Sequence, residues 1–97
     1  MTTNDIVQRL SGQLSEMRRR FSIQRLAVFG SAARDQLTDG SDIDILVVFQ
    51  GTATFDAFMD LKFYLEDLLQ RPVDLVTDKA LRPEVRRAIE EELVDVA

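Results

Sequence analysis

The sequence predicts an α/β fold in which a small β-sheet is covered by helices. Short apolar runs typical of buried strands alternate with longer segments in which apolar residues recur every three or four positions. The run at 43–49 is apolar almost throughout, as expected for a strand with helices on both faces of the sheet. A chain of 97 residues has room for one domain, and we expect residues 1–97 to form it.

The first half of the chain is predicted to contain a long helix, a strand and a short helix. Thr2 or Thr3 could cap the first helix. A strand is predicted over 25–30, a brief helix over 31–37 and a turn over 38–41. The apolar stripe of the first helix comprises Ile6, Leu10, Leu14, Met17 and Phe21.

The second half is predicted to contain two strands and two helices. The strand at 43–49 is followed by a helix over 54–70, which Arg71-Pro72 ends before a strand over 73–77. A last helix begins after Leu81. Its apolar positions are Val85, Ile89 and Leu93.

The helix predicted over 54–70 has two apolar stripes. One comprises Phe55, Met59 and Phe63, and the other comprises Phe58, Leu61, Leu65 and Leu68. One stripe can face the sheet. The second could contact a partner protein or pack into the same small core, and the sequence favours neither.

Composition excludes several classes of function. The chain has neither cysteine nor histidine, so disulfides, thiolate chemistry and histidine bases are excluded. We find no leader peptide and no apolar run long enough to span a membrane, so we expect a cytoplasmic protein without membrane contact. Arg18, Arg19 and Arg20 complement the negative end of the first helix or form a nucleic-acid patch. The net charge of −5 disfavours direct nucleic-acid binding.

Two carboxylates, Asp42 and Asp44, lie where the apolar run 43–49 begins. Residues two apart in a strand project from the same face, with Cα atoms about 6.6 Å apart. At an effective dielectric constant near 20, two carboxylates at about 4 Å would repel by roughly 4 kcal/mol, so their convergence calls for a cation. Mg²⁺ suits such hard oxygen ligands. The alternative is that both only bond turn amides after Gly40 and Ser41.

Two further features could complete a phosphate and metal site. Gly30 follows a strand and lets the backbone approach a ligand, and Ser31 offers an amide and a hydroxyl, although it could simply cap a helix. Asp74 interrupts the apolar strand 73–77. Beside the strand 43–49 it would bring a third carboxylate to a two-metal site, where it could accept a proton. Edge exposure or an ion pair with an arginine is the alternative.

The segment GSAARDQLTDGSDIDILVVF, with VDLVT downstream, resembles the minimal nucleotidyltransferases of the DNA polymerase beta-like superfamily. The resemblance covers nearly the whole chain and implies that family's mixed β-sheet with covering helices. It implies that Asp42, Asp44 and Asp74 are catalytic and hold Mg²⁺. It also implies that the phosphates of a nucleoside triphosphate, ATP in the first place, are bound by Gly30, Ser31, Arg34 and Ser41.

The chain departs from the family pattern at Asp35, where many members have glycine. The neighbouring Arg34 matches a frequent arginine of the family. It could contact a phosphate or form an ion pair with Asp35 or Asp39, and the sequence leaves both open.

The resemblance also implies a partner. Members of this group are similar to the antitoxin half of a two-gene pair whose toxin is a helical HEPN-family protein, and some transfer AMP to a tyrosine of that toxin. We therefore expect transfer of a nucleotide onto a hydroxyl of a HEPN-type toxin, in a homo- or hetero-oligomer. One alternative is an antitoxin that neutralises its partner by binding alone. Another is the same chemistry on a small-molecule or nucleic-acid acceptor, of which the acidic charge balance disfavours only the nucleic acid.

Overall fold

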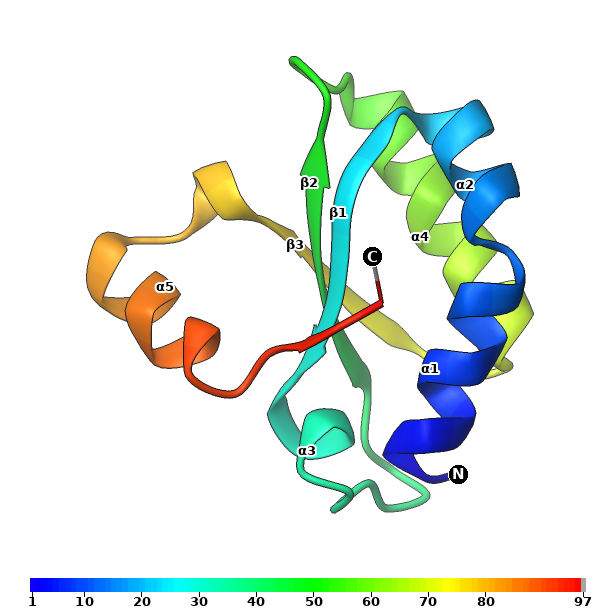
Figure 1. Cartoon of the computed structure of the whole chain (residues 1–97), viewed down its shortest axis with the longest axis vertical. Helices are drawn as coiled ribbons and strands as arrows, with labels where there is room; N and C mark the ends of the chain where they lie inside the picture. The colour runs from blue at the N-terminus through cyan, green and yellow to red at the C-terminus, as the bar shows by residue number, and fades with distance from the viewer. Residues whose placement is uncertain (97) are drawn as a thin grey trace.

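Figure 1 shows the computed structural model, which describes residues 1–96. The helices are α1 (Thr3–Gly12), α2 (Leu14–Phe21), α3 (Gly30–Ala33), α4 (Phe55–Leu69) and α5 (Pro83–Glu90), with a 3-10 turn at Asp78–Ala80. The strands are β1 (Ile23–Phe29), β2 (Ile43–Phe49), β3 (Val73–Thr77) and β4 (Val94–Asp95). The fold has the helices and small sheet that the sequence predicts.

The strands form one mixed sheet in the order β3-β2-β1-β4. β2 is parallel to β3, and β1 is antiparallel to both of its neighbours, β2 and β4. This arrangement confirms the mixed sheet that the family resemblance implies. β2 is one of the two inner strands, and its first residues lie beside the end of β1 and the start of β3.

The N-terminal segment consists of two helices, where the sequence predicted one. Gln13 departs from helical geometry with φ −115° and ψ 10°, directly after Gly12, a residue that weakens helices. The apolar stripe nevertheless continues across the break, because Leu10 and Met17 are both buried against the same core. Thr2 caps α1 in a capping box with Asp5, as one of the two predicted caps.

One face of the sheet packs against α1, α2 and α4, which lie together on one side of it in Figure 1. Alternate residues of β2 point to this face, and Ile43, Ile45 and Val47 have no exposed surface. β1 contributes Leu26 and Val28 to the same core. This face therefore supplies most of the apolar burial that stabilises the protein.

The two apolar stripes of helix α4 differ in their burial. Leu61 and Leu65 are buried against the sheet, whereas Phe55 and Phe63 on the other stripe are 75% and 57% exposed. Thr54 caps the first turn through a hydrogen bond from the Ala57 amide. No helix within residues 1–96, α4 included, is long and apolar enough to cross a membrane.

The opposite face of the sheet is covered much less. Helix α5 lies on this side in Figure 1, and none of its residues is buried. The chain then returns to the sheet, where the two residues of β4 pair with Ala27 and Val28 of β1. The sequence predicted a helical stripe reaching Leu93, but the helix ends at Glu90 because the chain must turn to reach the free edge of β1.

Candidate active site

The predicted aspartates gather at the start of β2, on the lightly covered face. Asp44 pairs in register with Asp74 of the parallel strand β3 and with Phe29 at the end of β1. Neighbouring strands lie about 4.8 Å apart, so the side chains of Asp44 and Asp74 are adjacent on one face. Asp42 precedes β2 by one residue and is exposed, as is Asp74, whereas Asp44 is half-buried. The three carboxylates therefore come from the start of β3, the start of β2 and the residue just before β2.

The electrostatics of Asp44 show how closely the acidic groups lie. Partial burial is the main cause that raises its pKa to about 6, followed by the negative charges of Asp74 and Asp42, a hydrogen bond with Asp74, and the charge of Glu92. The carboxylate of Asp44 is therefore costly to ionise in the absence of a cation.

A divalent cation would relieve this repulsion. The donor set of Asp42, Asp44 and Asp74 consists of carboxylate oxygens, the ligands that Mg²⁺ prefers. As the side chains lie, no group of three or more acidic residues within 1–96 is close enough to hold a metal ion. The chemistry of the donor set fits Mg²⁺, and holding it would require the exposed side chains of Asp42 and Asp74 to turn toward the half-buried Asp44.

Gly30 lies directly against Asp44. Its φ of +67° is in the left-handed region, and a Cβ atom built on it would overlap Oδ2 of Asp44. Only glycine therefore satisfies both the backbone conformation and the space at this position. Ser31 follows in the first turn of α3 and is half-buried. The predicted Gly-Ser corner thus adjoins the carboxylates.

Asp35 adopts the left-handed conformation, with φ +58°. Glycine reaches this conformation most easily and aspartate tolerates it better than most residues, which explains how Asp35 fits where the family often has glycine. Its Oδ1 accepts a hydrogen bond of 3.0 Å from the Thr3 amide, and the Thr3 hydroxyl donates to the Ala32 carbonyl. Asp35 therefore fastens the start of α1 to the loop after α3.

Ser41 is engaged within its own turn. Its Oγ accepts a hydrogen bond of 3.2 Å from the Thr38 amide and lies 2.7 Å from the Thr38 hydroxyl. Arg71, which sequence reasoning treated only as part of a helix break, donates to the carbonyls of Thr38 and Ser41. Arg71 therefore fixes the turn that leads into Asp42, a role that the local sequence does not signal.

Arg34 pairs with neither of the two aspartates that the sequence suggested. Its Nη1 donates to Oε2 of Glu92 at 2.7 Å, and its Nε donates to Gln36 at 3.2 Å. The other oxygen of Glu92 accepts a hydrogen bond of 3.1 Å from the Gly30 amide. Glu92 is thus a fourth carboxylate at the site, and sequence reasoning missed it because it lies inside the stretch predicted as the last helix.

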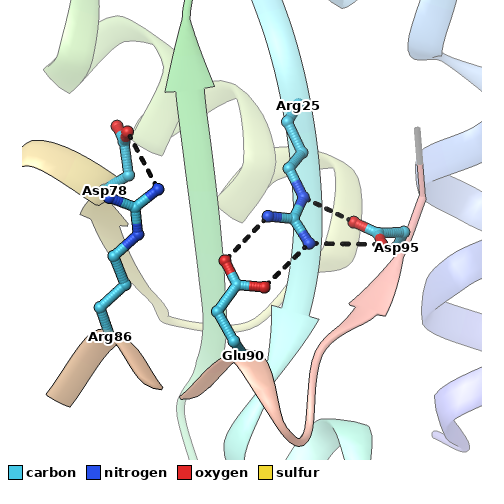
Figure 2. Close-up of polar contacts among 5 residues, drawn as sticks. All are labelled: Arg25, Asp78, Arg86, Glu90 and Asp95. Atoms are coloured by element: carbon cyan, nitrogen blue, oxygen red, sulfur yellow. Dashed lines mark hydrogen bonds and ion pairs between the residues drawn. The ribbon is translucent and has the colours of Figure 1, made fainter. Parts of the chain in front are cut away.

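Ion pairs hold the segment that carries Glu92 (Figure 2). Arg25 of β1 contacts Glu90 at 3.0 Å and Asp95 at 2.8 Å, so it binds both ends of the turn between α5 and β4. Arg86 of α5 lies 4.0 Å from Asp78. These pairs place Glu92 beside the Gly30 corner.

Comparison with known proteins gives a consistent match over this site. Residues 10–96 match the family described as nucleotidyltransferase domain. The chain is 35% identical over 96 residues to the protein adenylyltransferase MntA of Thermococcus cleftensis, covering 99% of this chain and 97% of that protein.

Solved structures show the same fold. A proposed minimal nucleotidyltransferase superposes with a TM-score of 0.84 at 34% identity, covering 97% of this chain and 95% of that one. A chain in the complex of a tri-AMPylated Shewanella oneidensis HEPN toxin with its MNT antitoxin superposes with a TM-score of 0.68 at 22% identity, covering 94% of this chain and 71% of that one. At 22% identity this second likeness concerns the fold.

Proposed function

Because the chain belongs to the nucleotidyltransferase domain family, we propose that it uses Mg²⁺ and ATP to transfer AMP onto a hydroxyl of a HEPN-type toxin. Membership of the family confirms the enzyme class that the Gly-Ser and aspartate motif predicts. The name of the Thermococcus relative supports AMP transfer to a protein. The solved complex of an AMPylated HEPN toxin with an MNT antitoxin supports the class of acceptor.

The observation that carries the proposal is the contact between Gly30 and Asp44. It sets the Gly-Ser corner, which can donate hydrogen bonds to phosphate oxygens, directly against a carboxylate that calls for a cation. A triphosphate chelated to Mg²⁺ would match both halves of this site, because the carboxylates would hold the cation and the Gly-Ser corner would donate to the phosphates.

The order of the strands supports a position for each of the two substrates. The triphosphate would lie over Gly30 and Ser31, at the end of β1. β3 is the edge strand next to β2, and its Asp74 is exposed. The acceptor hydroxyl would therefore approach from the β3 side, across Asp44 from the phosphates.

The residues of the chain then have distinct roles in the transfer. Asp42, Asp44 and Asp74 would hold Mg²⁺, which when bound neutralises charge on the attacking and leaving oxygens. The acceptor oxygen forms a bond to the α-phosphorus while the bond from that phosphorus to the bridging oxygen breaks, and pyrophosphate leaves. Asp74, on the acceptor side, accepts the hydroxyl proton.

Mass spectrometry of the acceptor tests this proposal. A purified HEPN-family toxin is incubated with Mg²⁺, ATP and either the wild-type chain or the double variant Asp42→Asn, Asp44→Asn. We expect an AMP adduct with the wild type and a rate lower by on the order of 10³-fold or more with the variant, because the two carboxylates act as one unit.

The other outcomes separate the alternatives. Equal adduct formation with both proteins would show that the two aspartates take no part in the reaction. Tight complex formation with no adduct from either protein would favour an antitoxin that acts by binding alone.

A further inference from the structure

Two of the hydrogen-bond donors assigned to phosphate are already in use. The Gly30 amide donates to one oxygen of Glu92, and the Arg34 guanidinium donates to the other. A carboxylate held by a backbone N–H and a guanidinium makes the same kind of charge-assisted contacts as a phosphate oxygen. Glu92 therefore occupies two of the donors that the proposed function assigns to a phosphate of the nucleotide.

We propose that Glu92 is an internal competitor of the triphosphate, which must displace the Glu92 carboxylate from Gly30 and Arg34 in order to bind. This inference rests on the proposed function, since it takes these two residues as phosphate ligands. An amide N–H carries a single hydrogen, so Gly30 cannot serve both anions well. The guanidinium of Arg34 is half exposed and has further donors, so the competition is sharpest at Gly30.

Repulsion from the neighbouring aspartates weakens the contact of Glu92 with Gly30 and Arg34. Glu92 adds a negative charge to a cluster that already holds Asp44, Asp74 and Asp42. The hydrogen bonds from Gly30 and Arg34 offset this repulsion, and a metal-bound triphosphate would bring its own cation to the cluster. The exchange of Glu92 for a chelated phosphate therefore relieves repulsion while keeping the same two donors occupied.

The segment around Glu92 makes few contacts with the core, those of the partly buried Val96 among them. No residue of α5 is buried, and β4 is joined to β1 by only a two-residue pairing, extended by a hydrogen bond of 2.9 Å from the Val96 amide to the Leu26 carbonyl. The ion pairs of Arg25 with Glu90 and Asp95 are partly exposed to water, and such pairs contribute little to stability. Release of Glu92 therefore disturbs few contacts.

Calorimetric titration of the purified chain with Mg²⁺ and ATP tests the inference. Glu92→Ala removes the competitor, and we expect the Kd to fall by about tenfold, the effect of one charge-assisted contact. Glu92→Gln keeps the shape of the side chain and should lower the Kd by a smaller factor. Glu91→Gln is the matched control, because it removes the same charge from the adjacent exposed residue, and its Kd should stay within about twofold of wild type.

Titration with a second ligand shows which part of the nucleotide competes with Glu92. Inorganic triphosphate with Mg²⁺ carries the phosphates without the base and sugar, so its Kd should fall by the same factor in Glu92→Ala. A fall seen with ATP alone would place Glu92 against the nucleoside and overturn the phosphate assignment.

The remaining outcomes are distinct from one another. A Kd that is unchanged or higher in both Glu92 variants would overturn the inference, and a higher value would make Glu92 a ligand of the bound state. Failure of the wild type and of every variant to bind either triphosphate would overturn the proposed function, and the inference with it.

Discussion

The two faces of the sheet differ in what their side chains do. On the face under α1, α2 and α4, alternate residues of β2 such as Ile45 and Val47 are fully buried among other apolar groups. On the opposite face the same strand begins with the half-buried Asp44, beside the exposed Asp74 and close to Glu92. The covered face thus carries most of the core, whereas the other face, although it buries Leu46, concentrates like charges at one end at a cost in stability.

This difference implies that stability and function can be changed separately. Apolar truncations on the covered face should weaken folding and leave ligand binding by the folded molecules intact. Changes at the acidic end of the open face should alter binding, and some should stabilise the metal-free protein.

The largest expected loss of stability comes from the covered face. Leu61 of α4 is fully buried against the sheet, so Leu61→Ala leaves a cavity and should lower the free energy of unfolding by about 3 kcal/mol. Urea unfolding followed by circular dichroism measures this. At low urea the folded fraction should bind Mg²⁺ and ATP with the wild-type Kd, and a large change in that Kd would show that the two faces are coupled.

A smaller loss of stability, with a large loss of binding, is expected at Gly30. Gly30→Ala forces a side chain into the left-handed region, which costs about 1–2 kcal/mol, and pushes against the carboxylate of Asp44. Nucleotide affinity, measured by calorimetry, should fall at least tenfold. The control is Gly12→Ala, where a Cβ meets no atom within 4 Å, and its affinity should not change.

The stability of Asp44→Asn relative to the wild type should depend on pH. The pKa of Asp44 is raised to about 6 in the folded protein, so the folded state binds this proton more tightly than the unfolded chain does. The stability that the protonated carboxyl provides is complete below about pH 4 and is lost as the pH rises through 6. In EDTA, Asp44→Asn should therefore be more stable than wild type by about 1 kcal/mol at pH 7.5, a modest value because water screens this half-buried group. Urea unfolding at both pH values measures this advantage, which should vanish at pH 4; a constant difference would contradict the assigned cause.

The smallest effect is expected on the outer side of α4. Phe63 is 57% exposed, so Phe63→Ser should change the free energy of unfolding by less than about 0.5 kcal/mol. The comparison with Leu61→Ala, two residues earlier on the same helix, is made by the same urea titration. A loss near that of Leu61→Ala would show that Phe63 contributes to the core.

Local sequence patterns were sufficient for most of the fold. The apolar runs located β2 at Ile43–Phe49 and β3 at Val73–Thr77 with the correct ends, because a buried strand needs apolar residues at nearly every position. The break at Gln13 was missed because the apolar stripe runs through it without a change of phase. β4 was missed because two residues carry no periodicity, and they become a strand only by pairing with β1.

The residues of the candidate site likewise differ in whether the sequence alone reveals them. Gly30, Asp44 and Asp74 could be found from sequence, because a glycine after a strand and acids within apolar runs conflict with simple burial and therefore attract attention. Glu92 and Arg71 could not, because their roles depend on partners 62 and 30 residues away in the chain. Nothing in their own neighbourhoods distinguishes them from ordinary surface charges.

We propose that the acidic end of the open face binds a metal-chelated nucleoside triphosphate. Thermal unfolding of the wild type and of Asp42→Asn, Asp44→Asn, each with and without Mg²⁺ and ATP, tests it most directly. Without ligand the double variant should be at least as stable as wild type, since it lacks the repulsion around Asp44. With ligand at about 100 times its Kd, only the wild type should gain, by about 2.7 kcal/mol. An equal gain in stability in both proteins, or none in the wild type, would contradict binding of the metal-chelated triphosphate by these aspartates.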